Sequence, residues 1–155
     1  MADDGKWLTE FGARRESVGN PVIYWLSLML FLVGTVGLLW SLPIPREFSD
    51  ISPLMNWGSA YLMAAAVYYF IISLSLGLGM IFFILGIATL EMWLSDLPVR
   101  LEYASSALTG TGVGGLCFGR YTNGGMRAVL RDIQLVMIAP AWLLSNLYRQ
   151  LGIPV

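Results

Sequence analysis

The sequence predicts an all-α membrane protein: a polytopic helix bundle of about four transmembrane helices, followed by a C-terminal interfacial or re-entrant helix. Two observations lead to this fold class. Hydrophobic residues make up 57% of the 155 residues and charged residues only 12%, whereas soluble domains carry ~25% charged residues. The apolar residues also fall in long runs without a charge. We therefore expect a single membrane domain over 1–155, which opens with a cytoplasmic segment, 1–21.

The first predicted span is 22–42, which lies between Pro21 and Pro43 and contains no charge. At 1.5 Å per residue, this length matches a hydrocarbon core of roughly 30 Å. Trp25 and Trp40 stand near its two ends, where tryptophan commonly anchors a helix at the membrane interface. The segment that follows is rich in proline and charge, so it is expected outside the membrane.

The second apolar run extends from Trp57 to Leu90 without a charged residue. It is too long for one span of ordinary tilt, so it predicts a helical hairpin with spans 57–72 and 76–95 and a turn at 73–77. A single long, bent helix is the alternative. Glu91 is the one carboxylate within a predicted span, and it is either an anchor at the interface or a buried partner of a cation such as arginine.

The fourth predicted span, 103–118, is rich in small residues, which let helices approach closely in lipid. This helix is therefore expected at the centre of the bundle, packed through Gly110, Gly112, Gly114 and Gly115. Glycines at this spacing also match a dinucleotide-binding turn. No β-strand is predicted before them, so helix packing is the favoured interpretation.

The remaining residues, 119–155, are expected to form a cytoplasmic or interfacial tail. The last apolar run, 133–147, is short for a span and contains Pro140, so it predicts the interfacial or re-entrant helix. Four spans place both termini on one side of the membrane. That side carries seven of the nine basic residues, so the positive-inside rule predicts cytoplasmic termini. The seven are Lys6, Arg14, Arg15, Arg120, Arg127, Arg131 and Arg149.

Four of these arginines, Arg15, Arg120, Arg127 and Arg131, are candidates for binding the headgroups of anionic lipids. The alternative is that they only set the topology. Membrane lipids and other integral membrane proteins are the expected partners. Nucleic acid is not expected, because the net charge is −1 and the basic residues form no dense run.

The chain contains no histidine and one cysteine, Cys117. Hydrolase triads that depend on histidine are therefore excluded, and neither a disulfide nor a cysteine-based zinc site can form within the chain. The only lysine, Lys6, lies in the N-terminal segment, where it cannot serve a buried nucleophile. We predict no catalytic residue, metal or cofactor.

Residues near both ends of the chain form a further pattern. The first part consists of Trp7, Leu8, Phe11, Asn20 and Trp25, and the second of Gly119, Asp132 and the closing segment APAWLLSNLYRQLG, 139–152. In these residues the chain resembles the Mpo-like family of small membrane proteins. Fungal members of that family are iron(II)-dependent dioxygenases that shorten 2-hydroxy fatty acids by one carbon.

The resemblance implies where family iron ligands would fall. The positions of the family's histidines are occupied by Arg15, Tyr24 and Arg120, whereas its asparagine is retained as Asn20. Non-haem iron(II) requires imidazole or carboxylate ligands, and arginine is permanently cationic. We therefore expect a non-catalytic relative, which acts as an accessory or structural subunit of a membrane complex or binds lipid or another hydrophobic ligand. The alternative is a lipid-modifying enzyme with an unrecognised site, for which Glu91, Tyr24 and the arginines are the candidates.

Overall fold

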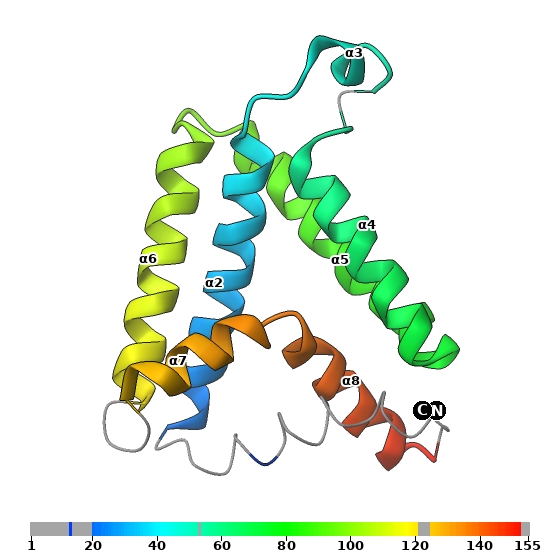
Figure 1. Cartoon of the computed structure of the whole chain (residues 1–155), viewed down its shortest axis with the longest axis vertical. Coiled ribbons are helices and arrows are strands. Elements are labelled where there is room, and N and C mark those ends of the chain that lie inside the picture. The colour runs from blue at the N-terminus through cyan, green and yellow to red at the C-terminus, as the bar shows by residue number, and fades with distance from the viewer. Residues whose placement is uncertain (1–12, 14–19, 53, 121–124, 153–155) are drawn as a thin grey trace.

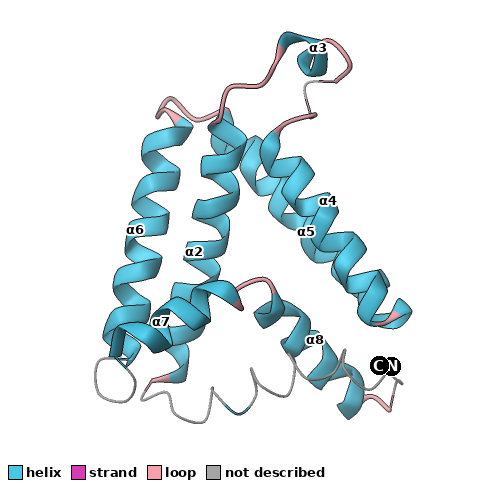
Figure 2. Ribbon diagram, viewed as in Figure 1, coloured by secondary structure: helices cyan, strands magenta, loops and turns pink. Residues whose placement is uncertain are grey.

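The computed structural model describes residues 13, 20–52, 54–120 and 125–152. Every regular element within these ranges is a helix, as Figure 2 shows, which confirms the all-α prediction for this part of the chain. The helices are α2 (Pro21–Ser41), α3 (Arg46–Ser49), α4 (Trp57–Ile72), α5 (Leu74–Ser95), α6 (Leu101–Arg120), α7 (Gly125–Gln134) and α8 (Ile138–Gln150).

Four longer helices form the body of the molecule (Figure 1). Helices α2 and α6 lie side by side and make the most extensive contact between any two elements. Helices α4 and α5 form a second pair, which meets α2 at one end and leans away from it towards the other. The short α3 lies beyond the closed end, and α7 and α8 cross the open end.

Helix α2 begins and ends within one residue of the predicted span 22–42. The side chain of Asn20 accepts hydrogen bonds from the backbone N–H groups of Val22 (3.1 Å) and Ile23 (3.4 Å), and thus caps the helix. Pro21 occupies the first helical position, where its missing N–H has no consequence. The helix ends before Pro43, because the residue that precedes a proline is disfavoured in helical conformation.

The predicted hairpin is formed by α4 and α5. Asn56 caps α4 in a reciprocal arrangement with Ser59, in which each side chain accepts from the other's backbone N–H. The two helices are joined by Ser73 alone, whose extended backbone (φ −160°, ψ 137°) reverses the chain. The turn is shorter than the predicted 73–77, since the structure already assigns Leu74 to Gly77 to α5.

Small residues form the contact between α2 and α6. A Cβ atom on Gly112 would lie 2.6 Å from the backbone nitrogen of Phe31, and one on Gly115 would meet the side chain of Ser27. Gly110 and Gly114 face open space instead. Of the four glycines predicted to pack, only Gly112 and Gly115 therefore face α2, whereas Gly110 and Gly114 lie on a different face of the helix.

The C-terminal region departs from the prediction of one helix over 133–147. It forms two helices, α7 and α8, separated by a turn at 135–137. Pro140 explains the break, because a continuous helix would place its ring against the carbonyl of Val136. In α8 it occupies the first turn, where a proline is tolerated. The hydroxyl of Tyr69 on α4 donates a hydrogen bond to the carbonyl of Met137 and holds this turn against the hairpin.

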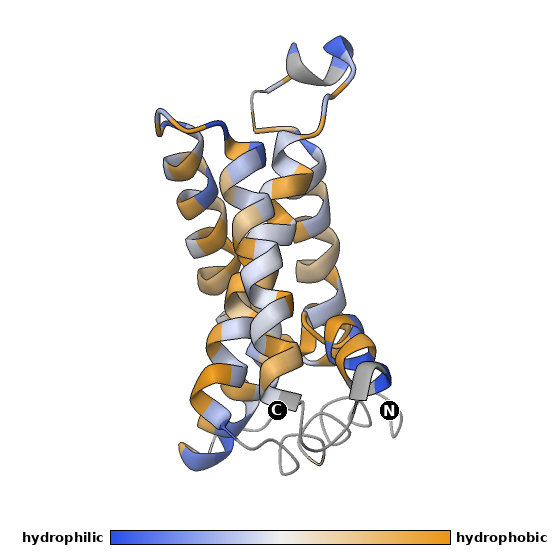
Figure 3. Ribbon diagram, turned by 90° about the vertical axis from the view of Figure 1, so that its left-hand side faces the viewer, coloured by the Kyte–Doolittle hydropathy of each residue, from blue (hydrophilic) through white to orange (hydrophobic). Residues whose placement is uncertain are grey.

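Among the described residues, two helices are long and apolar enough to cross a membrane: α2, with 21 residues, and α5, with 22. Helix α4 is apolar but has only 16 residues, which span about 24 Å. Helix α6 has 20 residues but carries many small polar ones. The four predicted spans therefore correspond to four helices, of which only two are both long enough and apolar enough to cross a membrane. Figure 3 shows apolar residues along the helices and hydrophilic residues at the two ends of the bundle.

Candidate functional site

An apolar cavity of about 640 Å³ lies between α2, α5 and α8, towards the open end of the bundle. None of the residues that line it carries an ionisable group, a hydroxyl or an amide in its side chain. They are Trp25, Leu26, Met29, Gly79, Met80, Phe83, Pro140, Leu143, Leu144 and Leu147. This lining can bind an apolar group, but it offers no acid, base or nucleophile for chemistry.

The spacing of these residues follows from helix geometry. Helix α2 contributes positions i, i+1 and i+4 beginning at Trp25, and α5 contributes the same pattern beginning at Gly79. Helix α8 contributes i, i+3, i+4 and i+7 beginning at Pro140. Each helix therefore presents one continuous stripe to the cavity, because residues three and four apart share a face.

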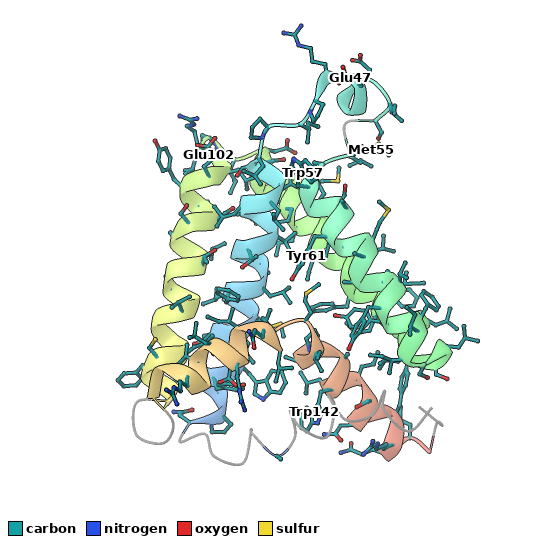
Figure 4. The ribbon with its side chains drawn as sticks, in the orientation of Figure 1. Glu47, Met55, Trp57, Tyr61, Glu102 and Trp142 are labelled. Atoms are coloured by element: carbon teal, nitrogen blue, oxygen red, sulfur yellow. The ribbon has the colours of Figure 1, made fainter. Side chains whose placement is uncertain are left out.

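Contacts at the edges of the cavity hold the three helices in place. The rings of Trp25 on α2 and Trp142 on α8 stack with centroids 6.1 Å apart and planes 24° apart. Trp142 is labelled in Figure 4, at the lower end of the molecule. Gly79 lets α8 approach α5, since a Cβ there would lie 2.5 Å from a methyl group of Leu144 and would also meet the hydroxyl of Tyr148.

A smaller cavity of about 160 Å³ lies at the opposite end, near the start of α4. Met55 and Trp57, both labelled in Figure 4, are part of its lining. The indole nitrogen of Trp57 donates a hydrogen bond of 3.2 Å to the carbonyl of Pro43. This bond links the start of α4 to the segment that follows α2. The smaller cavity therefore lies beside the connection between these two helices.

Glu91 on α5 is completely buried, at 0% exposure. Among the described residues, neither of its carboxyl oxygens has a hydrogen-bond partner. The side chain lies against α2, where a Cβ on Gly37 would come within 2.8 Å of its Oε2 atom and would also meet the side chain of Ser105 on α6. Burial does not fit the predicted interfacial anchor, and within the described ranges no arginine pairs with it.

Of the residues that the resemblance aligns with iron ligands, only Asn20 and Tyr24 can be placed in the structure. Arg15 and the side chain of Arg120 lie outside the described residues. The side-chain oxygen of Asn20 is engaged in capping α2, and Tyr24 is fully buried in the core. Within the described ranges, no group of three or more histidine, cysteine, aspartate or glutamate residues is placed to hold a metal ion. The described donors thus do not fit iron(II).

The remaining arginine candidates lie on α7. Arg127 and Arg131 are both exposed and stand four residues apart, so they project from the same side of the helix. Opposite them, Val129 and Asp132 are buried. This amphipathic pattern suits a helix that lies along a surface.

The cavity could not be predicted from the sequence. Trp25 and Met29 belong to an apolar span, but no pattern in the sequence indicates that α2, α5 and α8 together border an apolar space. One pattern in the sequence indicates part of the cavity lining. The helical spacing of Pro140, Leu143, Leu144 and Leu147 predicts one apolar face on the last helix.

No family model, curated protein or solved structure matches this chain.

Proposed function

We propose that this chain is a non-catalytic integral membrane protein that binds an apolar chain, such as the acyl chain of a lipid or a fatty acid, in the cavity between α2, α5 and α8. The observation that carries the proposal is the size and lining of that cavity. Its volume of about 640 Å³ falls within the ~300–1,000 Å³ typical of ligand sites. Its wholly apolar wall favours a ligand portion without polar groups.

The volume favours a single chain over a helix of a partner protein. A helix with its side chains is about 10–12 Å wide and rises about 5.4 Å per turn, so each turn occupies roughly 400–600 Å³. A cavity of about 640 Å³ would accept little more than one turn. A flexible alkyl chain can adapt its shape to the same space.

We further propose that α2, α4, α5 and α6 all cross the membrane, with both termini in the cytoplasm. Apolar side chains on the outer face of α4 support this placement, because Met63, Val67 and Ile71 are each more than half exposed and follow one stripe. The short α4 can be accommodated by local thinning of the bilayer. The cavity then lies towards the cytoplasmic face, at the end that also carries α7 and α8.

The exposed arginines of α7 suit an anionic lipid at that face. Arg127 and Arg131 would each contribute about 1 kcal/mol near an anionic surface. Arg15 and Arg120 belong to the same predicted group. Contact with other integral membrane proteins, as expected of an accessory subunit, would use the exposed apolar faces of the hairpin. The cavity makes ligand binding the preferred proposal.

The resemblance to the Mpo-like family is retained as a proposal for ancestry, without iron chemistry. In the proposed descendant, Asn20 caps α2 and Tyr24 is buried in the core, and the metal has been lost. The alternative, a lipid-modifying enzyme, predicts close to one equivalent of iron and oxygen uptake on a long-chain 2-hydroxy acid. We expect neither, and finding both would overturn the non-catalytic proposal.

The binding proposal is tested by two matched variants. Leu143→Trp places extra bulk in the cavity, whereas Leu78→Trp makes the same change on α5 at a residue that does not line it. Both leucines are about half exposed, at 46% and 54%. We expect the lipid or fatty acid retained after gentle purification, measured by native mass spectrometry, to fall only in Leu143→Trp. Equal retention in the two variants would contradict the proposal.

A further inference from the structure

Glu91 is the feature of this molecule that neither the cavity nor the membrane setting explains. It lies one turn before the end of α5, fully buried, at the junction of α5 with α2 and α6. The lining of the ligand cavity on α5 ends at Phe83, two turns earlier. The carboxyl group therefore forms a separate site within the same bundle.

The surroundings of Glu91 contain no compensating charge among the described residues. Gly37 from α2 and Ser105 from α6, which is itself buried, flank the carboxyl group, and neither is ionisable. Helix α4 starts at the same end of the bundle, and its first titratable residue is Tyr61. Helix α8 packs on α5 near Gly79, at the other end, so Tyr148 and Arg149 stay remote from this junction.

The charged residues nearest along the chain are turned to the solvent. Asp96 follows α5, and Arg100 and Glu102 stand at the start of α6, all three exposed. Arg100 forms an ion pair of 3.3 Å with Glu102. None of them therefore stabilises an ionised carboxylate at Glu91.

An ionised carboxylate without water, hydrogen bonds or a cation is strongly disfavoured in an apolar interior. A protonated carboxyl group carries no charge. It therefore needs fewer hydrogen bonds, and no cation, to be stable in such an interior. We propose that Glu91 is a proton-binding site inside the helix bundle, which holds its proton while α2, α5 and α6 are packed together and releases it only when this junction opens to water. The ligand of the site is the proton, and the bundle's close packing and the bound proton stabilise each other.

This proposal is tested by carboxyl modification of the full chain in detergent micelles or lipid nanodiscs. A hydrophobic carbodiimide reacts with protonated carboxyl groups in apolar surroundings, and peptide mass spectrometry locates the adduct. An unperturbed glutamate titrates near ~4.3, so exposed carboxyl groups are ionised at neutral pH. We expect an adduct on Glu91 at pH 6–7, its loss in Glu91→Gln, and slower labelling as the pH is raised to 9.

A water-soluble carbodiimide with an amine nucleophile is the control for access. It should modify the exposed Glu102 at least about ten times faster than Glu91. Modification of both residues at the same rate would overturn the proposal, because the carboxyl group would then be in contact with water. Labelling of Glu91 by the hydrophobic reagent that does not slow between pH 6 and pH 9 would overturn it as well.

A stability measurement adds a readout that does not depend on reagents. Because the packed state holds the proton and the opened state releases it, rising pH must weaken the packed state of the unaltered protein. Glutamine has the same shape and no proton to release. We expect the thermal midpoint of the unaltered protein to decrease from pH 6 to pH 9 by more than that of Glu91→Gln, and equal decreases would contradict the proposal.

Discussion

Replacing Gly112 by alanine tests the close contact between α2 and α6. Its new methyl group would lie 2.6 Å from the backbone nitrogen of Phe31 and 2.7 Å from its Cα atom. Favourable contacts between such atoms begin at about 3.5 Å, so the two helices would have to separate by about 1 Å. The obstacle is backbone, which cannot rotate away as the end of a side chain can.

The magnitude follows from two opposing effects. Overpacking a tight contact costs about 1–3 kcal/mol, and a backbone obstacle places this case in the upper half of that range. Alanine is favoured over glycine within a helix by about 1 kcal/mol. Gly112→Ala should therefore destabilise the protein by about 1–2 kcal/mol.

Gly114→Ala is the matched control, because its methyl group would meet open space. The gain in helix propensity is the same at both positions and cancels in the comparison. We expect the two variants to differ by about 2–3 kcal/mol in their free energies of unfolding, measured by denaturing-detergent titration in mixed micelles and followed by circular dichroism. Equal stabilities would refute the assignment of this face of α6 to the contact with α2.

Three further predictions concern the ends of the helices and their orientation. Tyr69→Phe removes the hydroxyl that donates to the Met137 carbonyl and should destabilise the protein by about 1–2 kcal/mol; the exposed Tyr103→Phe should change little in the same titration, and an equal loss in both would contradict the role of that bond. Asn20→Ala removes the cap of α2 at a cost of about 1 kcal/mol, and Asn20→Ser should restore most of it; a loss that serine does not restore would point to a role other than capping. Reporter tags at Met1 and Val155 should both report the cytoplasm, with a tag at Ser52 on the opposite side and one at Ser75 on the cytoplasmic side; an external signal from either terminus would overturn the proposed topology.

The bounds of the long helices could be predicted because charges and prolines interrupt the apolar runs. Pro21 and Pro43 enclose the first run, and α2 departs from the predicted 22–42 by one residue at each end. The hairpin followed from the length of the uncharged run alone. The prediction did not separate the two C-terminal helices. Pro140 disfavours a continuous helix, but the sequence does not show where the preceding helix, α7, ends.

Features that depend on the relative rotation of helices could not be predicted. A run of glycines does not reveal which members face a neighbour, so Gly112 and Gly114 were indistinguishable in the sequence. Glu91 lies near the end of its helix, where a glutamate can reach water as readily as it can point inward. The cavity combines residues from α2, α5 and α8, which are distant along the chain, and no local pattern reports their convergence.

The most direct test of the binding proposal is to locate a bound fatty acid. A long-chain fatty acid that carries a photoreactive diazirine would be incubated with the protein in nanodiscs and irradiated, and the adducts would be mapped by mass spectrometry. We predict saturable labelling at Met29, Met80 and Phe83, which line the cavity, and its displacement by excess unlabelled fatty acid. Labelling that does not saturate and that falls equally on the exposed Met63 and Val67 of α4 would show only contact with the surrounding lipid, and would contradict the proposal.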